Sequence, residues 1–329
     1  YQRGVQGFLD WVCYLYVLGL SIRDLQVLLY WQLGHVLSCN AINQVTLRVH
    51  QRMETHRYAR IEHTPSVLIV DGVWVEIQYS TGDVKLDRSG HQRHVRHAQE
   101  RVILAVMAVW PDGNHELLHY EIALKEETEA WRQVFDHLIE RGLNPNDVKL
   151  VVSDGSRGLL TAMGKTLPVA QQQRCITHKV RALDSYLKYK QLPTTDDTGQ
   201  PIEPQQARQQ RKVEVFTDAY HIYDAPTYEE AQQRCHGFIE KWGALEPDAI
   251  HAFQWGLERT FSYYQLEASW HRFIRTTNAL ERLFREFRTK ADEIGAFPNE
   301  QSCLTLFFLV IQLDHAKHNR KSVANKSGH

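Results

Sequence analysis

The chain has 329 residues, of which 43% are hydrophobic and 23% charged, with 38 basic residues against 39 acidic ones. This composition predicts a soluble globular protein of about two domains, or one domain with a large insertion, and excludes collagen-like, disordered and small disulfide-stapled proteins. No apolar run approaches the roughly 20 residues that cross a bilayer, and no signal peptide opens the sequence. Five scattered cysteines without a Cys-x-x-Cys pair favour free thiols in a reducing compartment.

Residues 1–62 show the periodicity of helices, and a turn around Gly34 joins two short apolar segments. Two short helices joined by a glycine-containing turn are typical of helix-turn-helix motifs, in which the second helix would present Asn43 and Arg48. We therefore predict a helical DNA-binding segment here, with a pair of simply packed helices as the alternative. Because the sequence starts at Tyr1, a few residues before the first apolar segment, we expect this DNA-binding segment to be truncated.

From Pro65 the pattern changes to strands, beginning with the apolar and β-branched run SVLIVDGVWVEI. A polar stretch with His91, His94 and His97 follows and is expected to be a solvated loop. Residues 63–183 then have the predicted order β-β-β-α-β-α-β. A meander of three strands followed by alternating helices and strands is the order of the ribonuclease H-like fold, an α/β architecture with a mixed sheet and flanking helices.

In two of the predicted strands an apolar run ends in an Asp-Gly pair, one at Asp71 and one at Asp154. An ionised carboxylate in an apolar strand is costly to bury unless a cation satisfies it. Two such carboxylates with a third nearby suit Mg²⁺, which prefers oxygen ligands. Glu76 is a poor third member because strand alternation points it away from Asp71. The alternative is that each Asp-Gly pair only turns the chain and caps the following helix.

A third carboxylate, Glu281, lies in a predicted helix that is capped by Thr277 or Asn278 and carries an apolar stripe. Glu281 borders this stripe and has arginines beside it. Pattern alone favours an exposed helix with ion pairs between residues four positions apart, such as Glu281 with Arg285.

Four stretches of the sequence carry a family resemblance. They are LIVDG around Asp71, SDGSRGLLTAM around Asp154, QRCITHKVRAL around His178, and RTTNALERLFREFRTKADEIGAFPNEQS around Glu281. In this order they resemble the Mutator-like transposases, the DDE-type enzymes of a large bacterial insertion-sequence family and its eukaryotic relatives. The Thr-Thr-Asn-x-x-Glu-Arg phrase with its following Gly-x-Phe-Pro block is the most specific part, and the resemblance covers roughly residues 15–312.

The resemblance implies that Asp71, Asp154 and Glu281 are the catalytic Asp-Asp-Glu set and bind Mg²⁺, for which Mn²⁺ can substitute. It also implies that His178, in a Cys-x-x-His signature with Cys175, acts beside them by contacting the scissile phosphate or orienting another group. Such an enzyme binds the terminal inverted repeats of its mobile element, cleaves the DNA ends and joins them to target DNA. Its partners would be double-stranded DNA and copies of itself, in a homodimer or larger synaptic assembly, on the nucleoid in the bacterial cytoplasm and away from membranes.

The resemblance also divides the chain into parts. Residues 63–183 match the first part of the catalytic core, 184–275 an all-α insertion that interrupts it, and 276–315 its final helices, with a basic tail over 316–329. Trp242 sits where related enzymes carry an insertion-domain tryptophan that stacks on a base near the cleavage site. The alternative is that Trp242 belongs to the core of the insertion.

Basic residues gather near the predicted catalytic segments although the net charge is −1. Phosphate binding requires local rather than global positive charge. We therefore predict DNA contacts from Arg181, which follows the Cys-x-x-His signature, and from Arg282 and Arg285, which follow Glu281. The alternative for each cluster is a solvated surface.

Two other functions stay open. A domesticated or truncated relative would bind terminal repeats without cleaving them. A ribonuclease H-like nuclease for RNA–DNA hybrids or Holliday junctions would fit the predicted fold, but not the Thr-Thr-Asn-x-x-Glu-Arg phrase or the insertion. A zinc site at Cys175 and His178 is disfavoured because no second Cys/His pair of suitable spacing follows.

Overall fold

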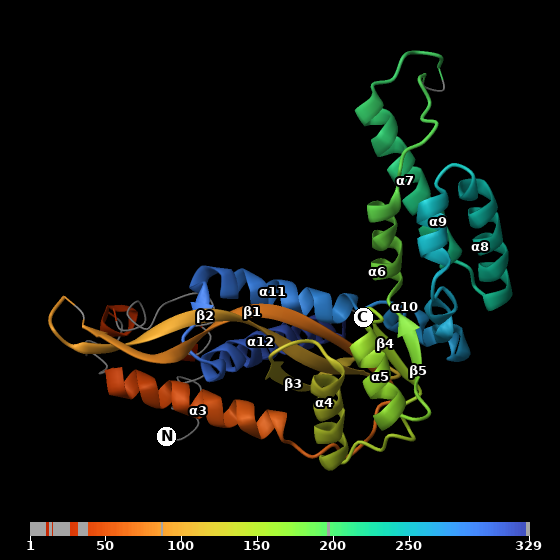
Figure 1. Cartoon of the computed structure of the whole chain (residues 1–329). Helices are drawn as coiled ribbons and strands as arrows, with labels where there is room; N and C mark the ends of the chain where they lie inside the picture. The colour runs from red at the N-terminus through yellow and green to blue at the C-terminus, as the bar shows by residue number, and fades with distance from the viewer. Residues whose placement is uncertain are drawn as a thin grey trace.

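The computed structural model (Figure 1) describes residues 11–12, 15, 27–31, 39–86, 88–195 and 198–326. Over these residues the centre is a six-stranded mixed sheet, with five strands in the order β3-β2-β1-β4-β5 and β6 paired with β1. The first three strands are antiparallel, whereas β4 and β5 continue parallel to β1. The strands are β1 (Val67–Leu86), β2 (Gln92–Val109), β3 (His115–Ala123), β4 (Leu150–Ser153), β5 (Gln171–Arg174) and β6 (Ala296–Phe297).

The hairpin of β1 and β2 is longer than its apolar part (Figure 1). Near the sheet centre both strands are buried, whereas their distal halves are exposed but remain paired. The expectation of a solvated loop is wrong for His94 and His97, which pair with Val84 and Tyr79 within this ladder. Backbone hydrogen bonds from the neighbouring strand extend β2 beyond its apolar residues, and a side-chain pattern does not report such pairing.

Helices cover both faces of the sheet, and alternate residues of β1 serve the two cores. Leu68 packs with Trp131 on the face covered by α4 and α5. Ile69 packs with Phe287 and Phe307 on the face covered by α3, α11 and α12. These helices are α3 (Cys39–Arg57), α4 (Thr128–Glu140), α5 (Arg157–Thr166), α11 (Asn278–Ile294) and α12 (Glu300–Lys326).

Between β5 and α11 the chain forms a helical arm that stands beside one end of the sheet (Figure 1). A buried ion pair between Arg211 and Glu246, 3.4 Å apart, ties two parts of this arm together. The α-helices are α6 (Ile176–Arg181), α7 (Pro204–Ile222), α8 (Tyr228–Gly243), α9 (Pro247–Gln254) and α10 (His271–Ile274). The 3-10 helices are η1 (Ala182–Tyr186), η2 (Glu258–Thr260), η3 (Ser262–Gln265) and η4 (Ala268–Trp270).

The predicted order of strands and helices over residues 63–183 is confirmed. Helical conformation is also confirmed over α3, whereas the turn around Gly34 lies outside the described residues. α12 continues to Lys326, through most of the predicted basic tail. Within the described part of the chain, no helix is long and apolar enough to cross a membrane.

Candidate active site

Asp71 and Asp154 are neighbours because of the register between two parallel strands. β1 and β4 pair with an offset that sets Val67 opposite Leu150. The same offset carries Asp71 opposite Asp154, which directly follows β4. The amide of Gly72 donates to Asp71 Oδ1 at 2.8 Å, which fixes the orientation of that carboxylate. The two Asp-Gly pairs thus meet at one edge of the sheet.

The turn chemistry of the second Asp-Gly pair is also present. The amide of Ser156 donates to Asp154 Oδ1 at 2.9 Å, and Gly155 has a φ of +92°, a conformation that favours glycine. A turn and a carboxylate site are therefore compatible at Asp154.

Glu281 reaches this edge from the first turn of α11. Thr277, which is fully buried, donates from its hydroxyl to Glu281 Oε1 at 2.9 Å. The Thr277 amide donates to the buried sulfur of Cys175 at 3.3 Å, so the start of α11 is anchored to the segment after β5. Thr277 therefore positions Glu281, and Cys175 packs as part of that support.

The electrostatics of Asp71 indicate a site for a cation. Burial raises the pKa of Asp71 to about 6, and the charges of Asp154 and Glu281 add to this effect against the opposing Gly72 amide and His178. Half-buried carboxylates that are close enough to affect one another repel, and their oxygen atoms are the donors that hard divalent cations such as Mg²⁺ prefer. The residues present therefore fit Mg²⁺.

In metal-free protein, Asp71→Asn is expected to raise the free energy of unfolding by roughly 1–3 kcal/mol at about pH 8. Asp71 binds its proton more tightly in the folded state, so folding weakens as the pH rises from its ordinary pKa of 3.8 to about 6, and stays weakened above. At about pH 4.5 the effect should be much smaller. Denaturant unfolding at both pH values measures it, with Asp136→Asn on α4, whose side chain is 38% exposed and ion-paired with Arg132, as the control. A destabilised Asp71→Asn protein at the higher pH would contradict the expectation.

His178 and Arg181 lie beside Glu281, one turn apart on α6. The distances to the Glu281 carboxylate are 4.0 Å from His178 Nε2 and 3.4 Å from Arg181 Nη1. The pKa of His178 is raised to about 9, and the neighbouring Cys175 is the largest cause. The charges of Asp71 and Glu281 contribute less, and burial acts in the opposite direction. This shift favours the protonated imidazole at neutral pH, next to the Glu281 carboxylate.

Sequence reasoning missed one carboxylate, Glu126, in the link between β3 and α4. Burial raises its pKa to about 7, with Asp154 and Asp71 as the next causes. Trp131 Nε1 donates to Glu126 Oε1 at 3.3 Å, and a Cβ added at Gly72 would lie 3.4 Å from Glu126 Oε2. Glu126 therefore lies near Asp71 and Asp154, on the side of the site from which α4 begins. In the sequence it stands in KEETE, which reads as the exposed, acidic start of a helix.

The stacking role expected for Trp242 is wrong for this structure, and the alternative of a core residue holds. Trp242 is 1% exposed and donates from Nε1 to Asp218 at 2.9 Å, so a base cannot reach its ring. An exposed tryptophan near the site is Trp255, which is 62% exposed and has its ring centre 5.4 Å from the Arg174 guanidinium. Arg174 ends β5 and interacts electrostatically with Asp154.

The other residues predicted to contact DNA are spread over two regions. Arg282 and Arg285 are exposed on α11, the helix that carries Glu281. Asn43 and Arg48 lie on α3, and their side chains are outside the described set.

Comparisons with known proteins identify the family. The sequence matches the family model described as "Transposase, Mutator family" over residues 1–202 and 203–321. It is 27% identical over 306 residues to the transposase of insertion sequence element ISRM5 from Rhizobium meliloti strain 1021, covering 93% of this chain and 68% of that protein. It is 26% identical over 303 residues to the transposase of element IS905 from Lactococcus lactis, covering 92% and 67% respectively.

A solved structure adds a likeness of fold. The Drosophila P element transposase strand transfer complex superposes with a TM-score of 0.50 at 8% sequence identity, over 92% of this chain and 91% of that chain. Because the family model matches almost the whole length, the chain belongs to the Mutator family of transposases.

Proposed function

We propose that this transposase binds the terminal inverted repeats of its mobile element and catalyses Mg²⁺-dependent DNA end cleavage and strand transfer on a ribonuclease H-like core. The observation that carries the proposal is the convergence of Asp71, Asp154 and Glu281 from β1, β4 and α11 at one sheet edge. Three carboxylates from segments far apart in the sequence have no common structural purpose at this edge, whereas together they suit a divalent cation.

Asp71, Asp154 and Glu281 would hold the metal, with Mn²⁺ as a substitute for Mg²⁺. The bound metal supplies activation of the attacking oxygen and stabilisation of the leaving oxygen of a phosphodiester. Thr277 holds Glu281 in orientation, and the Gly72 amide does the same for Asp71. His178, which lies next to Glu281, would in its protonated form donate a charge-assisted hydrogen bond to a phosphate oxygen.

The DNA track would run along the exposed arginines beside Glu281. Arg181 has a side chain that is 61% exposed, and Arg282 one that is 50% exposed. Together with Arg285 they provide local positive charge on a chain that is nearly neutral. Trp255 takes over the role of the exposed stacking surface, because an aromatic face accepts any base. Asn43 and Arg48 would read the repeat from α3.

Transposition joins two DNA ends, so the working unit would be a homodimer or a larger synaptic assembly on the nucleoid in the bacterial cytoplasm. The alternative is a relative that binds the ends without cutting them. The intact set of three carboxylates favours the enzyme.

The test uses the purified chain with linear DNA that carries the element's inverted repeats, compared with DNA in which the repeats are scrambled. With Mg²⁺ we expect nicks at the repeat ends and joined products, and none after chelation. Binding of the repeats without cleavage in Mg²⁺ or Mn²⁺ would establish the non-catalytic alternative. Cleavage of RNA–DNA hybrids in preference to repeat ends would instead indicate a nuclease.

A further inference from the structure

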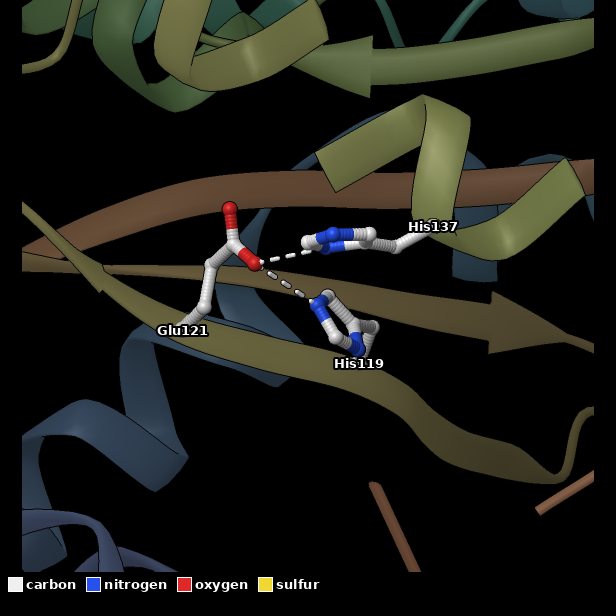
Figure 2. A group of neighbouring side chains, drawn as sticks. All are labelled: His119, Glu121 and His137. Carbon is white, nitrogen blue, oxygen red and sulfur yellow. Dashed lines mark hydrogen bonds and ion pairs between the residues drawn. The ribbon is translucent and has the colours of Figure 1, made fainter. Parts of the chain in front are cut away.

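Three side chains of types that bind metals, His119, Glu121 and His137, converge between the outermost strand β3 and helix α4 (Figure 2). His119 and Glu121 come from β3, the last strand in the sheet order, and His137 comes from the last turn of α4. Both imidazoles point at one carboxylate oxygen. Glu121 Oε2 lies 3.1 Å from His119 Nε2 and 3.0 Å from His137 Nδ1. All three ligand atoms lie within 4.8 Å of one another.

The local fold explains why these side chains converge. Residues two apart on a strand share a face, and here it is the face on which α4 packs. The register between β2 and β3 shifts at Leu118, which forms a β-bulge. This bulge determines the face of the sheet toward which the His119 side chain points. His137 stands at the C-terminal end of α4, where the helix dipole favours a cation.

The burial of the group suits a metal. The side chains are 0%, 14% and 43% exposed for His119, Glu121 and His137, so the group is closed on the core side and open toward solvent. Neutral imidazole and ionised carboxylate are the forms that coordinate metals.

We propose that His119, Glu121 and His137 form a binding site for a divalent transition-metal ion, with Zn²⁺ as the best match. Two imidazole nitrogens and one carboxylate oxygen are a ligand set that zinc accepts, with a fourth position left to water. Mg²⁺ prefers oxygen ligands and is a poor match. The bound ion would fasten α4 to the edge strand and so stabilise the folded chain.

One neighbour opposes the metal. Arg141 Nη1 lies 3.3 Å from Nδ1 of His119, and coordination through Nε2 moves the imidazole proton to Nδ1. Arg141 would lose this contact but keep its bonds to the carbonyl oxygens of Ala59 at 2.7 Å and Leu118 at 2.8 Å. The cost is therefore three hydrogen bonds, this one and the two between the imidazoles and Glu121, set against three ligand bonds.

The test titrates the chelator-treated full chain with Co²⁺, whose visible absorption reports nitrogen and oxygen ligands, and then displaces it with Zn²⁺. A Glu281→Gln background removes competition from the second possible metal group, Cys175, His178 and Glu281. In that background we expect one tight equivalent, and at least a roughly 100-fold weaker affinity after His137→Gln or Glu121→Gln. Zn²⁺ should raise the melting temperature of the background protein but not of these two variants.

The matched control is His236→Gln. His236 is 79% exposed and faces Glu240 at 3.6 Å, but this pair belongs to no group of three possible ligands among the described residues. His236→Gln should bind Co²⁺ like its background. Equal Co²⁺ affinity in His137→Gln and its background overturns the proposal, and so does the absence of a tight equivalent from the Glu281→Gln protein. Both outcomes leave the proposed transposase activity untouched, because no residue of this group belongs to the carboxylate site.

Discussion

Replacing Glu281 with glutamine is expected to lower the rate of Mg²⁺-dependent end cleavage by at least about 10³-fold. The substitution keeps the size of the side chain and an acceptor for the Thr277 hydroxyl, which lies 2.9 Å from Glu281 Oε1. It removes the charge that would complete the metal site with Asp71 and Asp154. The measurement is the rate of nicking at labelled repeat ends, under conditions in which protein exceeds DNA.

The same loss is expected for Asp71→Asn and Asp154→Asn, because each of these carboxylates would contribute a charged ligand to the metal that supports phosphoryl transfer. Repeat binding in the absence of metal should stay within a few-fold of the wild type, which separates catalysis from DNA affinity. The control is Glu293→Gln, on the same helix and paired with Lys290 at 3.6 Å. If all three carboxylate variants cleaved at the control rate, the assignment of the active site would be wrong.

The positions of Asp71 and Asp154 were predictable because strand order carries three-dimensional information. Two parallel strands in which an apolar run leads into the same dipeptide bring those dipeptides side by side when their register aligns the runs, and the observed register of β1 and β4 does so, although β1 itself continues to Leu86. The sequence pattern around Glu281 instead favoured an exposed helix with an Arg285 pair. In the structure its basic partner is Arg181, which lies in a distant part of the chain. A local pattern cannot report a contact between segments so far apart.

At Trp242, in the helical insertion, the prediction from the sequence was wrong for a different reason. Trp242 is the last of four buried residues on α8, with Ala231, Cys235 and Phe238 before it at spacings of three and four. That spacing is an apolar helical stripe and predicts burial. The expected stacking role came from the family resemblance, whereas the spacing agrees with the observed burial of Trp242. Trp255, which follows α9 and precedes Gly256, had no pattern around it that distinguished an exposed aromatic from a core one.

Glu126→Gln is the second substitution with a large expected effect, a loss of about 10²-fold in end cleavage at limiting Mg²⁺. Glu126 is held by Trp131 Nε1 at 3.3 Å and feels the charges of Asp154 and Asp71. A glutamate in this position would share in metal binding, directly or through a water molecule. The loss should therefore appear as a higher Mg²⁺ requirement and shrink as the Mg²⁺ concentration is raised.

The pH dependence gives this prediction a second readout. The pKa of Glu126 is raised to about 7, so at lower pH a proton competes with the metal for this side chain. The Mg²⁺ requirement of the wild type should rise as the pH falls below about 7, and the Glu126→Gln protein should show a weaker rise. Glu127→Gln, at the exposed neighbouring position, is the matched control and should behave as the wild type. A Glu126→Gln protein with an unchanged Mg²⁺ requirement would show that Glu126 is held near the aspartates by Trp131 and burial alone.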